Sequence, residues 1–143
     1  MDLNADFIQP MRDELTRIGF TELRTAEAVD QALGAASGTS LVFVNSVCGC
    51  AAGMARPGAA LALARTAVQP DNLFTVFAGQ DREATARARE KFGAVPPSSP
   101  SVALLKDGAL VAFLPRNQIE GRSAEDVSGL LVESFEAHCV SPA

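Results

Sequence analysis

The sequence of 143 residues contains neither tryptophan nor tyrosine, only one histidine, and only two lysines, Lys91 and Lys106. The aromatic side chains on which nucleic-acid bases stack are therefore reduced to phenylalanine, and no stretch supplies the basic patch that nucleic-acid binding requires. The net charge of −5 is equally unfavourable for binding to an anionic membrane surface. We therefore expect neither nucleic acid nor a membrane among the partners of this protein.

Long apolar stretches and targeting signals are also missing. No apolar run approaches the length of about 18 residues that a membrane-spanning helix needs. The first residues, 1–6, are acidic and polar and lack the basic start and apolar stretch of a signal peptide. These absences predict a cytoplasmic protein. The chain length is typical of a single domain, which we place at residues 1–143.

The sequence has few cysteines, but two of the three lie close together, as Cys48 and Cys50 with Gly49 between them. In a reducing compartment such a pair is typical of a redox or metal site rather than of a structural disulfide framework. The pair follows the apolar run 41–44, which predicts a strand buried on both faces. It precedes the alanine- and leucine-rich segment 51–68, which predicts a helix. The cysteines are thus expected where a strand turns into a helix.

This position predicts different chemistry for the two thiols. Cys48 is expected at or just before the helix N-terminus, where unpaired N–H groups and the helix dipole lower the pKa of a thiol. Cys50 is expected inside the first turn. We therefore interpret Cys48 as the attacking sulfur and Cys50 as the resolving one. A bridge between them would need unusual backbone angles at Gly49, and its strain would make it easily reduced.

Other interpretations of the pair remain open. Two nearby cysteines can be small buried apolar side chains in a protein without catalytic activity. Alternatively, the protein is a cysteine-based metal-binding or metal-delivery module. A zinc site of the Cys₃His type could be formed by Cys48, Cys50, His138 and Cys139, although zinc sites usually have a longer spacing between paired cysteines.

The rest of the chain predicts alternating helices and strands. Apolar periodicity and turn signals indicate helices at 7–18, 25–36, 81–92 and 123–138 and strands at 20–24, 73–78, 101–105 and 110–114. Thr25, Asp81 and Ser123 are expected to cap their helices, and Asp107-Gly108 predicts a hairpin. Pro57 falls inside the helix after the cysteines and should kink it. The order predicts an α/β fold, a central mixed sheet flanked by helices, with an extra N-terminal helix in residues 1–19.

A second proline stands at a position of interest. Ser99 and Pro100 end the breaker cluster 96–100, directly before a strand that can lie beside the strand of the cysteines. About 5% of peptide bonds before proline are cis in folded proteins. The position of Ser99-Pro100 makes a cis bond more probable here than this average frequency.

These features resemble the thioredoxin fold. The segment from Ser99 to Gly108 is similar to the cis-proline, strand and turn of thioredoxins, and Pro57 is similar to the proline that kinks their active-site helix. A closer resemblance, over nearly the whole chain, is to the bacilliredoxin family. It is carried by Val44 to Gly53 around the cysteines and by Ala55-Arg56-Pro57, Phe77 to Asp81, Pro97 to Ser101, Pro115-Arg116, Ile119-Glu120-Gly121 and Ala137-His138-Cys139.

The bacilliredoxin resemblance implies a thiol–disulfide oxidoreductase that removes bacillithiol, a low-molecular-weight thiol, from S-bacillithiolated client proteins. Cys48 would attack the mixed disulfide and take bacillithiol, and Cys50 or a second bacillithiol would release it. Weak disulfide isomerase activity is also implied. No tightly bound cofactor is expected, and bacillithiol serves as a thiol co-substrate.

Substrate binding is expected around the cysteines. Gly49 lies between them, and the resemblance implies that the loop of Ser99 and Pro100 binds the backbone of the thiol substrate. Bacillithiol carries a malate with two carboxylates, for which Arg56 and Arg116 are candidate ligands. The alternative is that both arginines are structural or simply exposed. Cys139 is given no role, and no oligomeric state is predicted.

Overall fold

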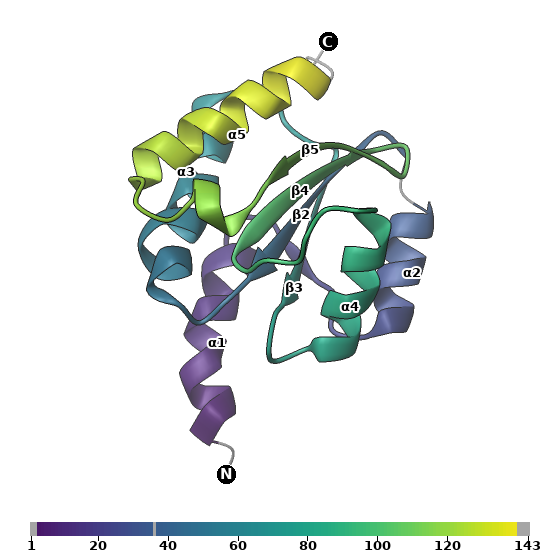
Figure 1. The fold of residues 1–143 in the computed structure, drawn as a ribbon, viewed down its shortest axis with the longest axis vertical. Helices are drawn as coiled ribbons and strands as arrows, with labels where there is room; N and C mark the ends of the chain where they lie inside the picture. The colour runs from purple at the N-terminus through teal and green to yellow at the C-terminus, as the bar shows by residue number, and fades with distance from the viewer. Residues whose placement is uncertain (1–2, 36, 140–143) are drawn as a thin grey trace.

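A mixed β-sheet forms the centre of the computed structural model, which describes residues 3–35 and 37–139 (Figure 1). Its strand order is β1-β3-β2-β4-β5. The strands are β1 (Thr21–Glu22), β2 (Thr39–Asn45), β3 (Asn72–Phe77), β4 (Ser101–Lys106) and β5 (Ala109–Leu114). Strands β1, β3 and β2 run parallel, whereas β4 is antiparallel to β2 and β5 to β4.

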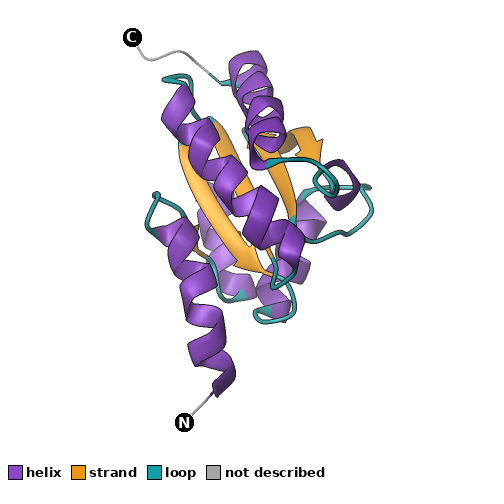
Figure 2. Ribbon diagram, turned by 90° about the vertical axis from the view of Figure 1, so that its left-hand side faces the viewer, coloured by secondary structure: helices purple, strands orange, loops and turns teal. Residues whose placement is uncertain are grey.

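Helices cover both faces of the sheet (Figures 1 and 2). They are α1 (Leu3–Thr16), α2 (Ala26–Ala35), α3 (Arg56–Arg65), α4 (Arg82–Lys91) and α5 (Ala124–His138), with a π-helical turn η1 (Ala51–Ala55) and a 3₁₀ turn η2 (Arg116–Gln118). Helices α1, α3 and α5 pack on one face and α2 and α4 on the other. This is a thioredoxin-like α/β fold with an added N-terminal helix. Within the described residues, no helix combines the length and apolar character needed to cross a membrane.

Strand β2 is buried along its whole length, as the apolar run 41–44 at its centre predicts. Successive side chains of a strand point to opposite faces. Leu41 and Phe43 accordingly enter the core under α3 and α5, and Val42 and Val44 enter the core under α2 and α4. The last residue of β2, Asn45, therefore stands at a fixed point from which the cysteine loop departs.

The helix after the cysteines is disturbed at the predicted place, but by a change of hydrogen-bond pattern. The turn η1 is π-helical, and α3 begins directly after it with Pro57 among its first residues. Proline donates no backbone hydrogen bond, and its ring clashes with a carbonyl one turn earlier in a regular helix. The wider turn is the form that this disturbance takes, and such turns occur frequently at functional sites.

Two of the three predicted helix caps are confirmed. Thr25 Oγ1 accepts a hydrogen bond from the N–H of Ala28 at 3.0 Å, and Ser123 forms a capping box with Asp126. Asp81 occupies the N-cap position of α4, but its side chain makes no capping bond. That prediction is wrong because the Asp81 carboxylate binds the guanidinium of Arg12 instead.

The predicted hairpin between β4 and β5 is also confirmed. Asp107 and Gly108 connect the strands with φ angles of 50° and 86°. Positive φ at both central residues is the requirement of the two-residue turn that Asp-Gly favours.

Helix α3 lies in close contact with α5 at Gly58, which predicts a measurable loss of stability for Gly58→Ala. A Cβ atom at Gly58 would lie 2.6 Å from Cγ1 of Val127 and 3.2 Å from the carbonyl oxygen of Ala124. Overpacking of this kind costs about 1–3 kcal/mol, which exceeds the gain in helix propensity. Urea denaturation should show a lower free energy of unfolding.

The matched control is Gly129→Ala in α5, because no atom lies within 4 Å of a Cβ there. This variant should be as stable as the unmodified protein or more stable by up to about 1 kcal/mol. Equal stability of the two variants would contradict the close contact at Gly58.

Candidate active site

The cysteine loop connects β2 to the helical segment as the sequence predicts. Helical hydrogen bonding begins at Cys48, whose carbonyl oxygen accepts from the N–H groups of Ala51 and Ala52 at 3.1 and 3.2 Å. Cys48 therefore occupies the N-cap position, and Cys50, with φ −62° and ψ −37°, lies in the first turn. Both thiols are free and half-buried.

The Cys48 sulfur is surrounded by hydrogen-bond donors. Burial alone would raise the pKa of the Cys48 thiol, but hydrogen bonds from the Ser46 hydroxyl and from the backbone N–H groups of Ala51 and Cys50 outweigh it. The positive charge of Arg116 acts in the same direction. The net effect lowers the pKa of Cys48, because each of these groups stabilises the thiolate more than the thiol.

The Cys50 thiol has the opposite tendency. Burial raises its pKa, and the neighbouring Cys48 sulfur raises it further by its charge and by accepting a hydrogen bond from Cys50. The two thiols thus ionise in a defined order, Cys48 first. This order is the chemical basis for distinguishing an attacking sulfur from a resolving one.

Gly49 leaves open space beside the two sulfurs. No atom lies within 4 Å of the position that a Cβ would occupy, and its φ angle is not in the left-handed region. Unusual backbone angles at Gly49 are expected only when Cys48 and Cys50 form a disulfide. In this structure both thiols are free. On the other side of Cys48, Val47 is 48% exposed. Cys48 thus stands between two exposed neighbours and is itself half-buried.

The loop of Ser99 and Pro100 lies at the same end of the sheet as the cysteines. Strand β4 pairs with β2 so that Ser101 stands opposite Val44, near the point where the cysteine loop leaves β2. The peptide bond between Ser99 and Pro100 is cis. The pairing of β2 with β4 brings together two segments that are about fifty residues apart in the sequence.

Arg116 connects this loop to the cysteines. Its Nη1 donates to the carbonyl oxygen of Ser99 at 3.3 Å, and its backbone N–H donates to Ser98 Oγ at 3.2 Å. The guanidinium also pairs with Glu120 and remains 42% exposed. A groove of about 580 Å³ adjoins it, lined among others by Pro97, Ser98 and Phe113. Arg116 therefore presents a partly exposed positive charge at this groove, and the same charge acts on Cys48.

Arg56 does not face this groove, and its expected role as a substrate ligand is corrected by the structure. Its side chain is buried, 4% exposed. Nη1 donates to Asn45 Oδ1 and to the carbonyl oxygen of Ser46, both at 2.9 Å, and Nε pairs with Glu14. A guanidinium with these partners in the interior is not available to a substrate carboxylate. Arg56 holds the cysteine loop instead.

The predicted zinc site of Cys48, Cys50, His138 and Cys139 is not assembled. The Cys139 thiol is hydrogen-bonded to Thr39 at the start of β2, whereas Cys48 follows the end of that strand. Seven residues of strand separate the two ends by roughly 20 Å. Among residues 3–35 and 37–139, no group of three or more histidine, cysteine or acidic side chains is arranged to hold a metal ion.

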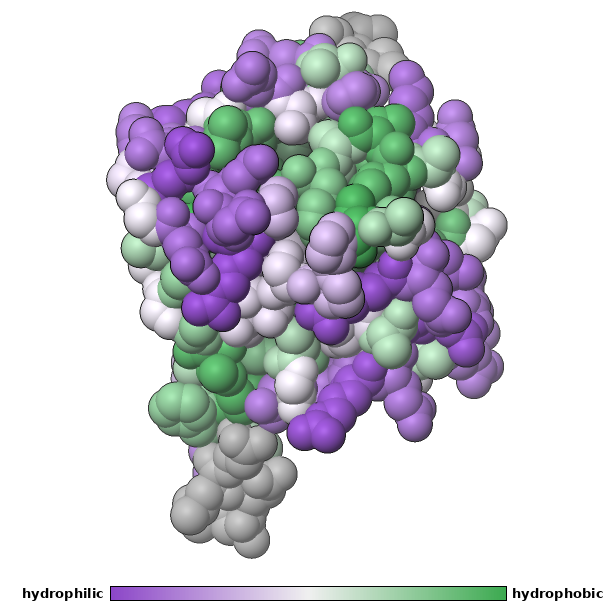
Figure 3. Space-filling model, in the orientation of Figure 1, coloured by the Kyte–Doolittle hydropathy of each residue, from purple (hydrophilic) through white to green (hydrophobic). Residues whose placement is uncertain are grey.

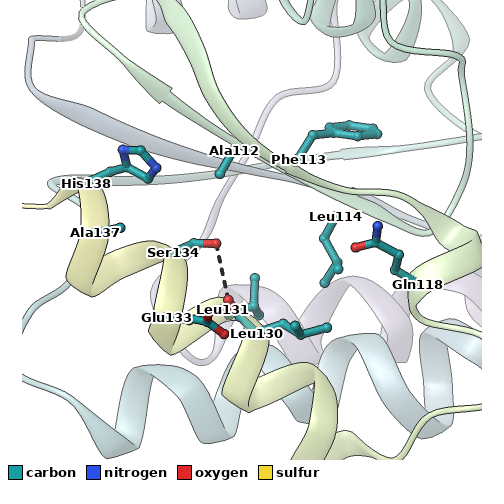
Figure 4. Close-up of a pocket in the computed structure, with 10 residues that line it drawn as sticks. All are labelled: Ala112, Phe113, Leu114, Gln118, Leu130, Leu131, Glu133, Ser134, Ala137 and His138. Atoms are coloured by element: carbon teal, nitrogen blue, oxygen red, sulfur yellow. Dashed lines mark hydrogen bonds between the residues drawn. The ribbon is translucent and has the colours of Figure 1, made fainter.

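His138 belongs to a different part of the surface. It lines a pocket of about 290 Å³ between α5 and β5, together with Ala112 and Leu130 (Figure 4). In this pocket the Ser134 hydroxyl donates to the carbonyl oxygen of Leu130 at 3.2 Å. Apolar side chains gather over β5 beside α5 on the same face of the molecule (Figure 3).

The sequence analysis assigned no role to three residues that hold the cysteine loop. Asn45 and Ser46 are buried polar residues, and Glu14 is on α1, more than thirty residues away. One signal was available for Asn45 and Ser46, because two polar side chains interrupt the apolar pattern directly before the cysteines. Glu14 carries no signal, since it is an ordinary charged residue on an amphipathic helix.

The fold and the site define a thioredoxin-like protein with a thiol pair placed for disulfide redox chemistry. Comparison with known proteins agrees with this class. Residues 3–139 match a protein family described as disulphide isomerase. A bacilliredoxin of Geobacillus kaustophilus is 56% identical over 138 residues, covering 96% of this chain and 95% of that protein.

Two further relatives show the same similarity. A bacilliredoxin of Symbiobacterium thermophilum is 58% identical over 140 residues, covering 96% of this chain and 98% of that protein. A bacilliredoxin of Bacillus cereus is 56% identical over 130 residues, covering 91% and 90% of the two chains. The chain belongs to the bacilliredoxin family, and its general function is thiol–disulfide redox chemistry.

Proposed function

We propose that this protein is a thiol–disulfide oxidoreductase that removes bacillithiol from S-bacillithiolated proteins. The observation that carries the proposal is the environment of the Cys48 sulfur, which accepts hydrogen bonds from Ser46 and from two backbone N–H groups at a helix N-terminus. These donors favour the thiolate, and the thiolate is the nucleophile in disulfide exchange.

The reaction proceeds by two exchanges. The Cys48 thiolate attacks the bacillithiol sulfur of the mixed disulfide, so that a Cys48–bacillithiol disulfide forms and the client leaves as a thiolate. The Cys50 thiol then loses its proton to solvent and attacks Cys48, which releases bacillithiol as a thiolate and leaves a Cys48–Cys50 disulfide. Alternatively, a second bacillithiol thiolate attacks the bacillithiol sulfur on Cys48, which yields bacillithiol disulfide and regenerates the Cys48 thiolate.

The order of ionisation supports this assignment of roles. Cys50 keeps its proton while Cys48 is a thiolate, so Cys50 does not compete for the incoming disulfide. Because thiols supply the electrons and disulfides accept them, the reaction needs no tightly bound cofactor. Return of the Cys48–Cys50 disulfide to two thiols requires a further thiol or dithiol as reductant, which becomes oxidised to a disulfide in turn. The same exchanges, with a client cysteine in place of bacillithiol, account for a weak isomerase activity.

Substrate binding is proposed at the residues that border the Cys48 sulfur. Gly49 leaves room for the bacillithiol moiety, and the backbone of Ser99 and Pro100 faces the client chain. Arg116 is the proposed ligand of a malate carboxylate, since its guanidinium is partly exposed and its charge acts on Cys48.

The variant Cys50→Ser tests the proposed roles because it removes the resolving thiol alone. We expect this variant, incubated with an S-bacillithiolated client, to accumulate one bacillithiol per chain. Mass spectrometry of peptides should place the adduct on Cys48. The variant Cys139→Ser, with both active-site thiols intact, should accumulate no more adduct than the unmodified protein. An adduct on Cys139, or none on Cys48, would contradict the proposal.

A further inference from the structure

A chain of hydrogen bonds, buried in its central part, leads from helix α1 to the reactive cysteine. Glu14 on α1 pairs with Nε of Arg56. Arg56 Nη1 donates to Asn45 Oδ1 and to the carbonyl oxygen of Ser46, both at 2.9 Å. Asn45 Oδ1 accepts in addition from the N–H of Ser46 at 2.9 Å. Both backbone polar groups of Ser46 are therefore held in place by Arg56 and Asn45.

The Ser46 side chain completes the chain. Its Oγ accepts a hydrogen bond from the backbone N–H of Cys48 at 3.3 Å, which places the hydroxyl beside Cys48. Hydrogen bonding by this hydroxyl lowers the pKa of the Cys48 thiol. Helix α1 is tied to the same loop a second time, because Asn45 Nδ2 donates to the carbonyl oxygen of Met11 at 3.2 Å. The orientation of the Ser46 hydroxyl thus depends on groups that do not touch the sulfur.

We propose that Arg56, anchored by Glu14, is a positioning residue that orients the Ser46 hydroxyl toward the Cys48 sulfur, so that helix α1 forms part of the redox site. The proposal rests on the role of Cys48 as the attacking thiol. Arg56 acts by geometry rather than by charge. Holding three partners at once requires the planar guanidinium group. A lysine at this position carries the same charge but lacks that planar arrangement of donors.

Arg116 provides the contrast. Its guanidinium is 42% exposed and influences Cys48 through its positive charge, which mobile ions screen. Arg56 is buried and influences Cys48 through hydrogen bonds, which salt affects little. The two arginines therefore differ in how the reactivity of Cys48 depends on ionic strength, although both favour the thiolate.

The experiment measures alkylation of Cys48 by iodoacetamide as a function of pH, with mass spectrometry of peptides to separate the three cysteines. For Arg56→Lys we expect Cys48 alkylation at neutral pH to slow by roughly threefold to tenfold, because the thiolate loses a hydrogen bond. The difference should vanish at alkaline pH, where the thiol is ionised in both proteins, and should be unchanged by salt. Arg116→Gln should also slow alkylation at low salt, but the effect should fade as salt is added.

A second variant and a control distinguish a local effect on Cys48 from a general loss of folding. Glu14→Ala changes a half-exposed residue of α1, and we expect a smaller slowing of Cys48 alkylation with the same pH dependence. Arg65→Lys, on α3, disturbs an ion pair with Glu125 and a contact with Ser128, and should leave Cys48 unchanged. Unaltered alkylation in both Arg56→Lys and Glu14→Ala, or a slowing that persists at alkaline pH, would overturn the proposal. Since iodoacetamide replaces bacillithiol, the result does not depend on whether the proposed substrate is correct.

Discussion

Replacing Cys48 by serine is expected to abolish the release of bacillithiol from client proteins, with a loss on the order of a thousandfold or more. A serine hydroxyl cannot form the mixed disulfide, and burial, the largest cause of the raised pKa of Cys50, persists when Cys48 is replaced. The measurement is the rate at which the client loses bacillithiol, followed by mass spectrometry of the client.

The pH dependence of the unmodified protein gives the same prediction a second readout. The pKa of Cys48 is lowered, so its thiolate forms, and the rate rises, at a lower pH than for an ordinary cysteine. The rate should reach its plateau before Cys50 and Cys139, whose pKa values are raised, begin to ionise. A Cys48→Ser variant with undiminished activity, or a plateau above the range of free cysteine, would contradict the assignment of Cys48 as nucleophile.

The largest effect on stability is expected for Arg12→Met. Arg12 is 6% exposed. Its Nη1 lies 2.7 Å from both Glu22 and Asp81, and its guanidinium lies 5.1 Å from the ring centroid of Phe77. Methionine keeps the apolar stem but removes the buried guanidinium from both carboxylates, and Asp81 keeps only the exposed Arg24 at 3.6 Å. Such a loss costs about 3–5 kcal/mol, which thermal or urea denaturation will register.

The control for Arg12 is Arg65→Met. The ion pair of Arg65 with Glu125 joins two helices but is exposed, with 39% and 67% of the side chains accessible. Exposed pairs contribute about 0–1 kcal/mol, so this variant should unfold at nearly the same denaturant concentration as the unmodified protein. Equal losses in the two variants would show that burial does not distinguish the two ion pairs.

Much of the fold follows from short-range patterns. The apolar run 41–44 predicts a strand buried on both faces, and β2 is buried throughout. The turn at Asp107-Gly108 and the capping box at Ser123 depend on residues within four positions of each other, so the sequence displays them completely. The position of Cys48 at a helix N-terminus is local in the same sense.

Contacts between distant segments were not predictable in this way. Asp81 has the right residue type and position for a helix cap, yet its carboxylate binds Arg12, sixty-nine residues earlier. The sequence offers the same local signal for both outcomes. The buried guanidinium decides between them, because an unpaired buried charge costs far more than a helix cap contributes.

The cysteine pair shows the same division. The sequence by itself determined that two thiols stand where a buried strand meets a helix, and which of them ionises first, because strand burial and helix termini are local properties. Only the tertiary structure decided that Arg56 is buried behind the loop while Arg116 borders the sulfur, and that Cys139 lies at the other end of β2. The physical reason is that the pairing of β2 with β4 and the docking of α1 determine which residues surround the cysteines. Neither contact produces a recognisable pattern in the sequence of the residues that it brings together.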